Sequence, residues 1–408
     1  MTNEIRVQKY GGTSVGSAEK IKKIATKIKK LKDNDPNEKI VIIVSAMGKT
    51  TDDLVKLAYI CAKTPNPREY DALISTGENI SASLLAMCLI EIGIDAISLS
   101  GAQAGILTEK SHSKAKVIKV NPKRIHQALD QNKVVIITGF QGINEHEDIT
   151  TIGRGGSDTS AVIIASSLNS SLCEIYTDVE GVYTTDPRIV KNAKKLSEIS
   201  YEEMLDLAHL GAKVLHPRAV ECAKTNNIKL HVRSSFSDKE GTIVKEASSM
   251  ELNKTVTGIA VNKTEAIVSI IGVENKAGVA GEIFELLANK NINVDMIIQS
   301  VKYGNLNSIS FSIEEDDLQK TLKAANTLIT KLHAKEIKTD QNIAKISIVG
   351  VGMTSKPGVA AQMFKALGKH AINIKHITTS EIKISCVINR DQADEAQKIL
   401  HETFNLHK

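Results

Sequence analysis

The run that decides the fold class is Lys39-Ile-Val-Ile-Ile-Val-Ser45, in which five β-branched residues follow one another without a polar interruption. A second run of the same kind is Val134-Val-Ile-Ile-Thr138. Continuous apolar runs of this length are typical of strands that helices cover on both faces, as in a largely parallel sheet. We therefore expect both segments to be buried strands.

Amphipathic helical patterns lie between the strand-like runs. One apolar stripe stops at Asp33-Asn-Asp-Pro36, and it consists of Ile21, Ile24, Ala25, Ile28 and Leu31. A second helix is predicted from Ser157 to Leu168. For roughly the first 235 residues this alternation predicts an α/β fold, a three-layer sandwich with a largely parallel sheet.

The pattern changes after Phe236, and we place a domain boundary near residues 240–255. Beyond it, residues 276–297 align with residues 356–377 at an offset of 80, and nine of the 22 pairs are identical. Each copy follows a short strand and continues through an amphipathic helix into another strand. The repeat predicts two related β-α-β modules, since a solenoid needs more copies.

Composition restricts the class of protein. The 408 residues suggest two or three domains, and 42% hydrophobic with 24% charged residues is typical of a soluble globular chain. The 52 Lys and Arg outnumber the 47 Asp and Glu by five, but the excess is spread over solvated helix faces. We therefore expect no nucleic-acid partner.

Cysteine usage and the N-terminus indicate the compartment. The five cysteines are far apart and never in a C-x-x-C arrangement, so neither a disulfide framework nor a zinc site is implied. The segment Met1-Thr-Asn-Glu-Ile-Arg6 lacks the apolar run of a signal peptide, and no uninterrupted apolar stretch has the length of a membrane span. We expect a cytoplasmic protein with no membrane partner.

The first of three glycine-containing motifs is Lys9-Tyr-Gly-Gly-Thr-Ser-Val-Gly16, which precedes the helix around Ile21. Glycines let the backbone approach a ligand, amide groups at a helix start favour phosphate oxygens, and a nearby lysine can contact a phosphate. A tight strand-to-helix turn with a surface lysine explains the Gly-Gly pair alone equally well.

The second motif is Thr151-Ile-Gly-Arg-Gly-Gly-Ser-Asp-Thr159, which opens the helix predicted from Ser157. Ser157 or Asp158 suits a helix N-cap, so a structural turn explains part of the motif. It does not explain Arg154, one of only eight arginines in the chain. A planar bidentate donor between glycines favours a carboxylate or phosphate ligand.

The third motif is Tyr176-Thr-Asp-Val-Glu-Gly-Val-Tyr-Thr-Thr-Asp-Pro-Arg188, after the strand-like Glu174-Ile-Tyr176. Asp178, Gly181 and Asp186-Pro187 are ordinary turn formers, so half of the motif needs no ligand. The motif nevertheless follows the carboxyl end of a predicted strand, where open α/β sheets bind ligands.

Two further glycine motifs are excluded. Met47-Gly-Lys-Thr50 resembles the end of a P-loop, but Ile43 stands where the loop needs its first glycine. Gly350-Val-Gly-Met-Thr-Ser355 lacks the third glycine of a dinucleotide fingerprint.

The three accepted motifs together describe a kinase without a P-loop, which works by positioning and charge neutralisation. No conspicuous base is present, which suits a carboxylate acceptor, because it is already ionised at neutral pH.

The chain resembles the aspartokinase family. The three motifs and Gly211-Ala-Lys-Val-Leu-His-Pro-Arg218 resemble its signatures in order, and the tandem repeat resembles the paired ACT domains of monofunctional members. The resemblance implies an amino-acid kinase domain at 1–240, a connection at 241–262, and α+β, ferredoxin-like ACT domains at 263–340 and 341–408. It also implies transfer of the γ-phosphoryl group of ATP, carried with Mg²⁺, to the side-chain carboxylate of L-aspartate. That reaction begins the synthesis of lysine, threonine, methionine and diaminopimelate.

The resemblance carries functional residues over to matching positions. Lys9 would stabilise the phosphates and Asp158 would organise the transferring group. Arg154 would bind the α-carboxylate of aspartate, and the rest of the substrate pocket would comprise Thr51, Glu78, Gly155, Gly156 and Ser157. The ATP-binding positions would be Lys9, Tyr10, Gly11, Gly12, Tyr176, Thr177, Asp178, Val182, Tyr183, Thr184, Thr185, Asp186, Pro187, Arg188 and Lys213. Glu78 would pair with an ammonium group, although a first-turn helix position explains it too. No metal site beyond the Mg²⁺ carried with ATP is implied.

The ACT pair implies inhibition by lysine, threonine or both, and a homo-oligomer formed through these domains. The implied effector-binding positions are Asn275, Lys276, Ala277, Gly278, Val279, Ala280, Asn293, Asp295, Gln299, Pro357, Gly358, Val359, Ala360, Asn373, Ile374, Ser380 and Glu381. Asn293 and Asn373 are equally well explained as turn residues. The first repeat has Asn275-Lys-Ala-Gly278 where the family usually has Asp-Lys-Pro-Gly, which removes an acid able to pair with the effector's ammonium.

Other interpretations stay open. Met250 lies near the position at which some relatives start a separate regulatory subunit, so an α2β2 assembly from one reading frame is an alternative. The enzyme could instead be a related amino-acid kinase acting on glutamate or another small carboxylate. A catalytically silent amino-acid sensor is a third reading, which the intact Lys9, Arg154 and Asp158 argue against.

Overall fold

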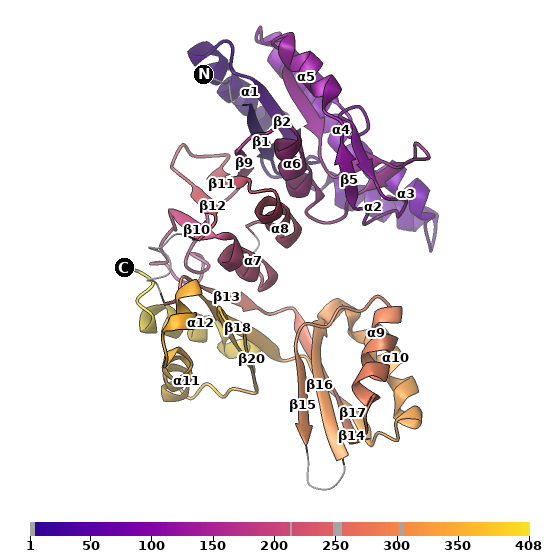
Figure 1. Cartoon of the computed structure of the whole chain (residues 1–408), viewed down its shortest axis with the longest axis vertical. Coiled ribbons are helices and arrows are strands. Elements are labelled where there is room, and N and C mark those ends of the chain that lie inside the picture. The colour runs from indigo at the N-terminus through magenta and orange to yellow at the C-terminus, as the bar shows by residue number, and fades with distance from the viewer. Residues whose placement is uncertain (1–4, 213, 248–254, 302–305) are drawn as a thin grey trace. The chain divides into compact units, whose positions relative to one another are not determined.

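The computed structural model of the chain describes residues 5–212, 214–247, 255–301 and 306–408. It contains two compact units (Figure 1). The first comprises Met1–Tyr183 and Lys195–Leu252, and the second comprises Thr184–Lys194 and Asn253–Lys408. A segment from the middle of the expected kinase domain therefore belongs to the second unit, which the sequence did not indicate.

The first unit is built on an eight-stranded sheet of order β10-β12-β11-β9-β1-β2-β6-β3. Every neighbouring pair in it is parallel except β11 with β12, which confirms the predicted α/β class. Its strands are β1 Arg6–Tyr10, β2 Ile40–Val44, β3 Ala96–Leu99, β6 Val134–Thr138, β9 Leu172–Thr177, β10 Glu198–Ser200, β11 Lys229–Ser234 and β12 Thr242–Lys245. Both β-branched runs are strands that are buried at every position.

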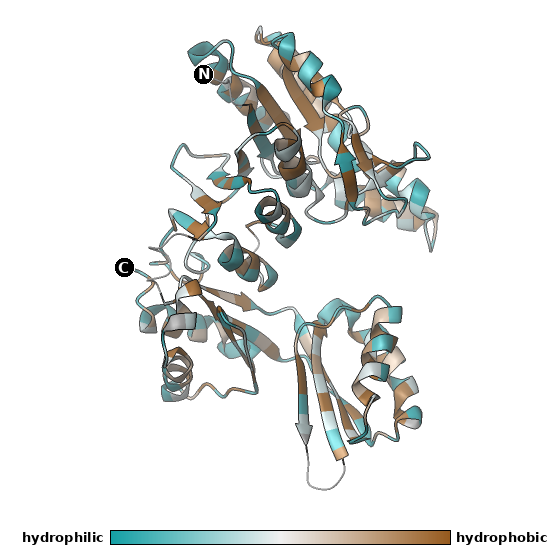
Figure 2. Cartoon of the chain, viewed as in Figure 1, coloured by the Kyte–Doolittle hydropathy of each residue, from teal (hydrophilic) through white to brown (hydrophobic). Residues whose placement is uncertain are grey.

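Helices cover the two faces of this sheet. Helices α1 (Ala18–Asn34) and α4 (Thr76–Glu91) pack over one face, where the predicted stripe around Ile21 and Ile28 meets Ile40 and Ile42 of β2. Because side chains alternate along a strand, Val41 and Ile43 project to the opposite face, on which α6 (Gly156–Ser167) lies. In Figure 2 the strands at the centre of the first unit are largely brown, whereas the helices around them mix teal and paler colours.

Further elements surround the central sheet. They are α2 Thr50–Cys61, α3 Pro67–Ile74, α5 Lys123–Asp130, α7 Tyr201–His209 and α8 Pro217–Thr225. A second sheet of order β5-β4-β7-β8 contains β4 Ile106–Thr108, β5 Val117–Val120, β7 Gln141–Ile143 and β8 Ile149–Thr151. The last of these strands ends directly before the Gly153–Gly156 stretch, so the small sheet sets where that stretch begins.

The stretch Pro67–Glu91 is long and apolar enough to span a membrane by composition. The fold gives it another role, because half of its most apolar window is buried. It consists of α3 and α4, and Leu85 and Leu89 of α4 pack in the core against the sheet. This stretch is a core element of the first unit.

The second unit contains two modules that correspond to the predicted repeats. The first module has the sheet order β15-β16-β14-β17, and the second has β13-β18-β20-β19. The first comprises β14 Glu265–Glu274, α9 Val279–Asn289, β15 Ile297–Val301, β16 Leu306–Glu314, α10 Leu318–Lys331 and β17 Glu336–Asp340. The second comprises β13 Gly258–Asn262, β18 Ile343–Val349, α11 Val359–Lys369, β19 His376–Thr379, β20 Lys383–Asn389 and α12 Ala393–Thr403. Short 3-10 turns occupy Glu315–Asp317, Val351–Ser355 and Arg390–Gln392.

The expected connection 241–262 is not a simple linker. It contains β12, which pairs with β10 and β11 in the first unit, and β13, which pairs with β18 in the second module. The second module is therefore assembled from two separated parts of the chain, with the first module inserted between them. Local patterning could not reveal this, because β13 gains its partner almost 90 residues later.

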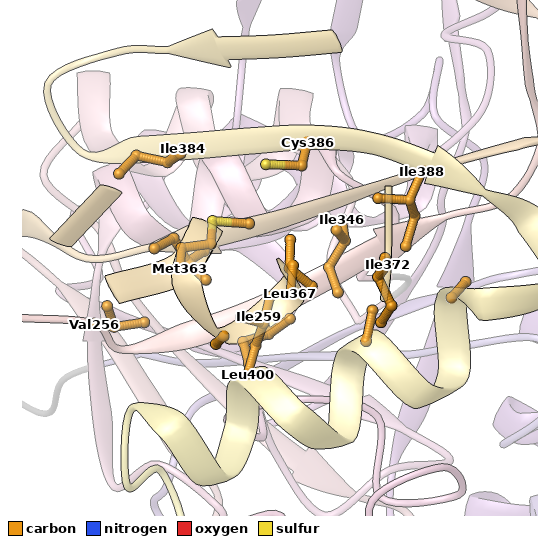
Figure 3. Packing of buried hydrophobic residues seen from close by; sticks show 14 of the residues in the cluster. Val256, Ile259, Ile346, Met363, Leu367, Ile372, Ile384, Cys386, Ile388 and Leu400 are labelled. Carbon is orange, nitrogen blue, oxygen red and sulfur yellow. The ribbon is translucent and has the colours of Figure 1, made fainter. Parts of the chain in front are cut away.

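Each module has its own apolar core. In the second module, Ile346 of β18, Met363 and Leu367 of α11, Cys386 of β20 and Leu400 of α12 pack together (Figure 3). The core of the first module lies between its sheet and the helices α9 and α10. Two cores of the same plan are the structural counterpart of the sequence repeat.

An ion cluster links the two modules, and two of its three side chains are buried while that of Asp295 is 55% exposed. Lys345 of β18 pairs with both Glu265 of β14 and Asp295, which precedes β15. The side chains of Lys345 and Glu265 are only 3% and 4% exposed. Removing one member of such a cluster leaves a buried charge without a partner, which is strongly destabilising.

Replacing Lys345 by alanine is expected to lower the free energy of unfolding of the second unit by about 3–5 kcal/mol, because Glu265 loses its cation. The double variant Lys345→Met with Glu265→Gln is expected to recover most of this loss, since it buries no net charge. Calorimetric unfolding of the full chain measures both. Equal melting temperatures for wild type and Lys345→Ala would contradict the structural role of the cluster.

Candidate active site

A cavity of about 570 Å³ lies in the first unit, beside the carboxyl ends of β1 and β2. It brings together Lys9 and Asp158, the predicted catalytic pair, with every residue predicted for the aspartate pocket. The lining residues are Lys9, Gly12, Ser45, Ala46, Gly48, Thr51, Asp52, Val55, Tyr70, Ile74, Glu78, Ser113, Lys114, Phe140, Gly153, Arg154, Gly155, Gly156, Ser157 and Asp158. Segments far apart in the sequence thus line one space.

Lys9 and Asp158 form an ion pair in this cavity. The Lys9 Nζ atom lies 2.6 Å from Asp158 Oδ1, and the two side chains are only 10% and 13% exposed. Lys9 is on β1 and Asp158 is in the first turn of α6. A carboxylate at this distance keeps the ammonium group in the cavity, where it can contact an incoming anion.

Glycine is required in both of the motifs that line the cavity. A Cβ atom on Gly12 would lie 2.9 Å from the carbonyl oxygen of Ala46. Gly155 has φ +70°, and a Cβ atom there would lie 2.0 Å from the ring of His216, which belongs to the fourth family motif. These two glycines therefore permit close packing of the loops, whatever else they bind.

The N-cap of α6 is Gly155, in a left-handed conformation, and no side chain caps this helix. The prediction that Ser157 or Asp158 is the N-cap is therefore wrong. The helix starts earlier because Gly155 can adopt the positive φ at which the chain turns. Uncapped amide groups at this helix start, beside the cavity, suit an anionic ligand.

Glu78 is a buried carboxyl group that forms no ion pair with any cation of the described residues. It lies in the first turn of α4 and is 3% exposed. Its Oε1 atom accepts a hydrogen bond of 3.1 Å from the amide of Ala46, while Oε2 has no hydrogen-bond partner among the described residues. Burial raises the pKa of Glu78 to about 7. An ammonium group in the cavity would supply the missing partner.

Arg154 is exposed at the cavity, and no carboxylate of the described residues forms an ion pair with it. A hydrogen bond fixes the start of its loop, because the guanidinium of Arg218 donates to the carbonyl of Ile152 over 2.6 Å. Arg154 is thus a cation available to a ligand, in a loop of defined position.

Asp71 of α3 organises the neighbouring hairpin and is fully buried. Its carboxylate accepts hydrogen bonds from the amide and the hydroxyl of Thr151, at 2.9 and 2.7 Å, and from the amide of Ser113, at 2.8 Å. These hydrogen bonds fix Ser113, which precedes the cavity residue Lys114, and Thr151, which begins the second motif. Lys114 and Phe140 line the cavity although the sequence analysis did not select them, because neither belongs to a recognisable motif.

The predicted ATP-binding residues do not all have accessible side chains. Tyr10 and Tyr176 are each 1% exposed and stack at 4.7 Å between ring centroids, as part of the core. Only their backbone can contribute to ligand binding. Val182 is likewise buried, and its amide donates to Thr242 Oγ1. None of residues 176–188 lines the cavity, and Lys213 lies outside the described residues.

The predicted effector positions fall at equivalent places in the two modules. Gly278 and Gly358 have φ +96° and +95° and precede α9 and α11. The side-chain Nδ2 of Asn307 donates a hydrogen bond of 2.9 Å to Oδ1 of Asn275, while Asp295 pairs with Lys345. Asn293 and Asn373 are exposed, and the left-handed turn residues are instead two positions earlier, at Asn291 and Ala371.

Comparison with known proteins agrees with this arrangement. A model of the amino acid kinase family matches residues 4–234, and a model of an ACT domain matches residues 268–328 and 346–404. The aspartokinase of Bacillus sp. strain MGA3 is 48% identical over 400 residues, 98% of this chain and 97% of the relative. Aspartokinase 2 of Bacillus subtilis strain 168 is 47% identical over 402 residues, 98% of each chain.

The chain belongs to the aspartokinase family. As a member of this family it is an ATP-dependent kinase. Among solved structures, aspartate kinase from Clostridium acetobutylicum has a TM-score of 0.77 and 27% identity, over 98% of this chain and 100% of that one. Aspartokinase III of E. coli, solved with aspartate and ADP, has a TM-score of 0.82 at 24% identity, over 98% and 99% of the two chains, and shows the shared fold.

No cluster of three or more His, Cys, Asp or Glu residues suited to a metal occurs in the part of the chain that the structure describes. A Mg²⁺ ion held mainly by nucleotide phosphates needs only one or two carboxylates. Asp52 and Asp158 are the aspartates that line the cavity, so the donor set fits such an ion.

The ionisation of Glu78 is expected to control substrate affinity. Because its pKa is about 7, the carboxylate that can pair with an ammonium group is lost as the pH falls through 7. Between pH 8 and pH 6 the KM for aspartate should rise about tenfold, with a smaller change in the KM for ATP. Steady-state kinetics across this range measure both.

The matched variant for this test is Glu78→Gln, which keeps the shape and removes the titration. It should have a high KM for aspartate that stays nearly constant from pH 6 to pH 8. A pH dependence identical to that of the wild type would exclude Glu78 as its source.

Proposed function

We propose that this protein transfers the γ-phosphoryl group of ATP to the side-chain carboxylate of L-aspartate, which gives 4-phospho-L-aspartate. One observation carries the proposal: two cationic side chains and one buried carboxyl group line the same cavity. Lys9 suits a phosphate, Arg154 suits a carboxylate, and the unpartnered Oε2 of Glu78 suits an ammonium group. Aspartate and the γ-phosphate of ATP present that combination of groups.

The amino acid would be held by its α groups. Glu78 would pair with the α-ammonium group, and Arg154 would form a bidentate interaction with the α-carboxylate. Thr51 and Ser157 offer hydroxyl groups in the same cavity. The side-chain carboxylate then extends toward Lys9. Glutamate would project one methylene further, so the spacing favours the shorter substrate.

The chemistry requires two anions to approach each other. The attacking carboxylate is ionised at neutral pH and needs no general base. Lys9 and the amide groups at the start of α6 reduce the repulsion and stabilise the charge on the transferring group. Asp158 holds the Lys9 ammonium in place. A Mg²⁺ ion bound to the phosphates would supply further charge neutralisation, with Asp158 and Asp52 as the carboxylates available to it.

ATP would approach through the glycine loop and the third motif. Gly11 and Gly12 form the backbone turn beside Lys9, and the amide of Gly11 donates to the carbonyl of Tyr176 over 3.1 Å. That hydrogen bond joins the first and third motifs, which supports one nucleotide site made from both. Of the predicted ATP-binding residues of the third motif that lie in the first unit, Thr177, Asp178 and Tyr183 remain at least partly exposed.

The regulatory part of the proposal concerns the second unit. We infer that lysine, threonine or both bind at the turns before α9 and α11 and inhibit the kinase, whose product leads toward lysine, threonine, methionine and diaminopimelate. The equivalent left-handed glycines, Gly278 and Gly358, support a pair of similar ligand-binding turns. Asp295 is already paired with Lys345, so an effector's ammonium would have to compete for it.

The ACT modules are also proposed to join copies of the chain. β15 and β19 are equivalent strands at the edges of their sheets, and neither has a second strand partner among the described residues. The repeat-equivalent Ile297 and Ile377 on these strands are 55% and 45% exposed. Unpaired edges that expose large apolar side chains favour association with another chain.

The reaction is tested with purified protein, ATP, Mg²⁺, L-aspartate and hydroxylamine, which should yield aspartyl hydroxamate. Glutamate in place of aspartate separates this proposal from a related amino-acid kinase. If the protein binds lysine or threonine but phosphorylates neither aspartate nor glutamate, it is an amino-acid sensor. This result would exclude the proposed reaction.

In the same assay, Arg154→Lys is expected to raise the KM for aspartate roughly 10- to 100-fold, because a lysine cannot form the two-pronged contact. The matched control is Arg68→Lys, at an exposed arginine that pairs with Asp148 outside the cavity. It should leave the KM unchanged. Similar kinetics for both variants would remove Arg154 from the substrate site.

The oligomer proposal predicts that Ile297→Lys together with Ile377→Lys shifts the protein toward smaller species. Analytical ultracentrifugation measures this, with Ile118→Lys as a control at an exposed isoleucine of the first unit. The same mass distribution for the wild type and the double variant would place the association surface elsewhere.

A further inference from the structure

Part of the third motif is bound within the second unit. Thr184–Lys194 belongs to that unit, although Tyr176–Tyr183 belongs to the first. Thr184 and Thr185 are only 3% and 4% exposed. The last five predicted ATP-binding positions, from Thr184 to Arg188, are therefore in the second unit, and the side chains of Thr184 and Thr185 are buried there.

The backbone of β13 forms hydrogen bonds with this segment. The amide of Ile259 donates to the carbonyl of Thr184 over 2.8 Å. The hydroxyl of Thr185 donates to the carbonyl of Ile259 over 3.0 Å. The two threonines thus pair with one residue of the strand, much as an added strand would.

Two side chains of α12 complete the attachment. Gln397 Nε2 donates to the hydroxyl of Thr185 over 2.5 Å, and His401 Nε2 lies 3.1 Å from the hydroxyl of Thr184. Gln397 is 3% exposed and His401 is fully buried. Because these polar groups are shielded from water, each hydrogen bond that is lost leaves a buried group without a partner.

The ends of the segment are tied together. The amide of Thr184 donates to the carbonyl of Lys194 over 2.9 Å, and the amide of Leu196 donates to the carbonyl of Val182 over 2.8 Å. Tyr183 and Lys195 form an isolated antiparallel bridge. Residues 182–184 are therefore hydrogen-bonded to residues 194–196. Because of these bonds, we expect a displacement of Thr184 to move Val182 and Tyr183 as well.

The same helix contacts the start of α11. Ala396 and Leu400, which flank Gln397 and His401 on α12, share a core with Val359 and Met363 of α11. Val359 begins α11 directly after the turn that contains Gly358. Helix α12 thus packs against the helix that begins at the proposed effector turn, and it also forms hydrogen bonds with Thr184 and Thr185.

We propose that Gln397 and His401 are positioning residues for ATP: by holding Thr184 and Thr185, they set the conformation of the nucleotide-binding part of the third motif. The inference rests on the proposed ATP site. Its consequence is that a perturbation of α12 changes nucleotide affinity without touching the aspartate pocket. None of the residues that line the catalytic cavity belongs to this network.

The test uses the full-length protein with Gln397→Leu and with His401→Leu, which preserve bulk and remove the hydrogen bonds. The KM for ATP is expected to rise about five- to tenfold, while the KM for aspartate changes less than twofold. His401→Gln restores an amide near the position of Nε2 and should recover much of the affinity. A rise in both KM values together, or no change in either, would overturn the proposal.

Matched controls separate positioning from a general loss of stability. Gln319→Leu and His370→Leu carry the same substitutions in the same unit, at an exposed residue of α10 and at the exposed C-cap residue of α11. They should leave the KM for ATP unchanged, and calorimetric melting of all variants is compared. If the controls raise the KM for ATP as much as Gln397→Leu does, the effect is one of module stability and the proposal fails.

A double-variant cycle gives a second test. If Gln397 acts through Thr185, then Thr185→Val combined with Gln397→Leu should raise the KM for ATP no more than the larger single change. Additive effects would show that the two residues act separately and would contradict the network.

Failure of the proposed reaction is distinguishable from failure of this inference. If the wild type forms no aspartyl hydroxamate, the reaction is wrong, and calorimetric titration with ATP still compares nucleotide binding by the wild type and the α12 variants. If the wild type forms the product and the α12 variants bind ATP as tightly as it does, the reaction stands and the inference alone is wrong.

Discussion

Parallel pairing of β1 with β2 on one side and β9 on the other is the constraint on which the first unit depends. In this register Tyr10 lies opposite both Val44 and Tyr176, so the three strands end at the same edge of the sheet. Each strand is followed by a loop that the proposed reaction uses. The hydrogen bonds of an eight-stranded sheet therefore convert motifs more than 150 residues apart into neighbours.

Charge burial is the second organising feature. Lys9, Asp158 and Glu78 are all largely removed from water, which is unfavourable for isolated ions. Lys9 and Asp158 offset this by pairing, whereas Glu78 keeps one unpartnered oxygen and a raised pKa. A site of this kind suits a ligand whose charged groups pair with those of the site. The geometry therefore favours an amino acid that also carries a side-chain carboxylate over a neutral substrate.

The repeat produces two modules of one plan with different surroundings. The first module is inserted between β13 and β18 of the second, and Lys345 joins the two through an ion cluster. Among the described residues, β13 and α12 of the second module hold Thr184 and Thr185 by hydrogen bonds. Two modules of one plan therefore have different surroundings, because the second forms hydrogen bonds with Thr184 and Thr185 of the third motif.

The amino-acid sequence by itself determined the local elements. Uninterrupted β-branched runs required buried strands, the Ile21 stripe required an amphipathic helix, and the internal repeat required two similar modules, because burial imposes a periodicity that can be read along the chain. The sequence also singled out Arg154 and the glycines that flank it, since their residue types are unusual for an ordinary turn, and these residues line the cavity. The tertiary structure alone decided the partners. The pairing of Lys9 with Asp158, the place of Lys114 at the cavity, the N-cap at Gly155 and the transfer of Thr184–Lys194 to the second unit all depend on residues distant in sequence. No local pattern specifies such partners, because a side chain's own type indicates only that it needs one.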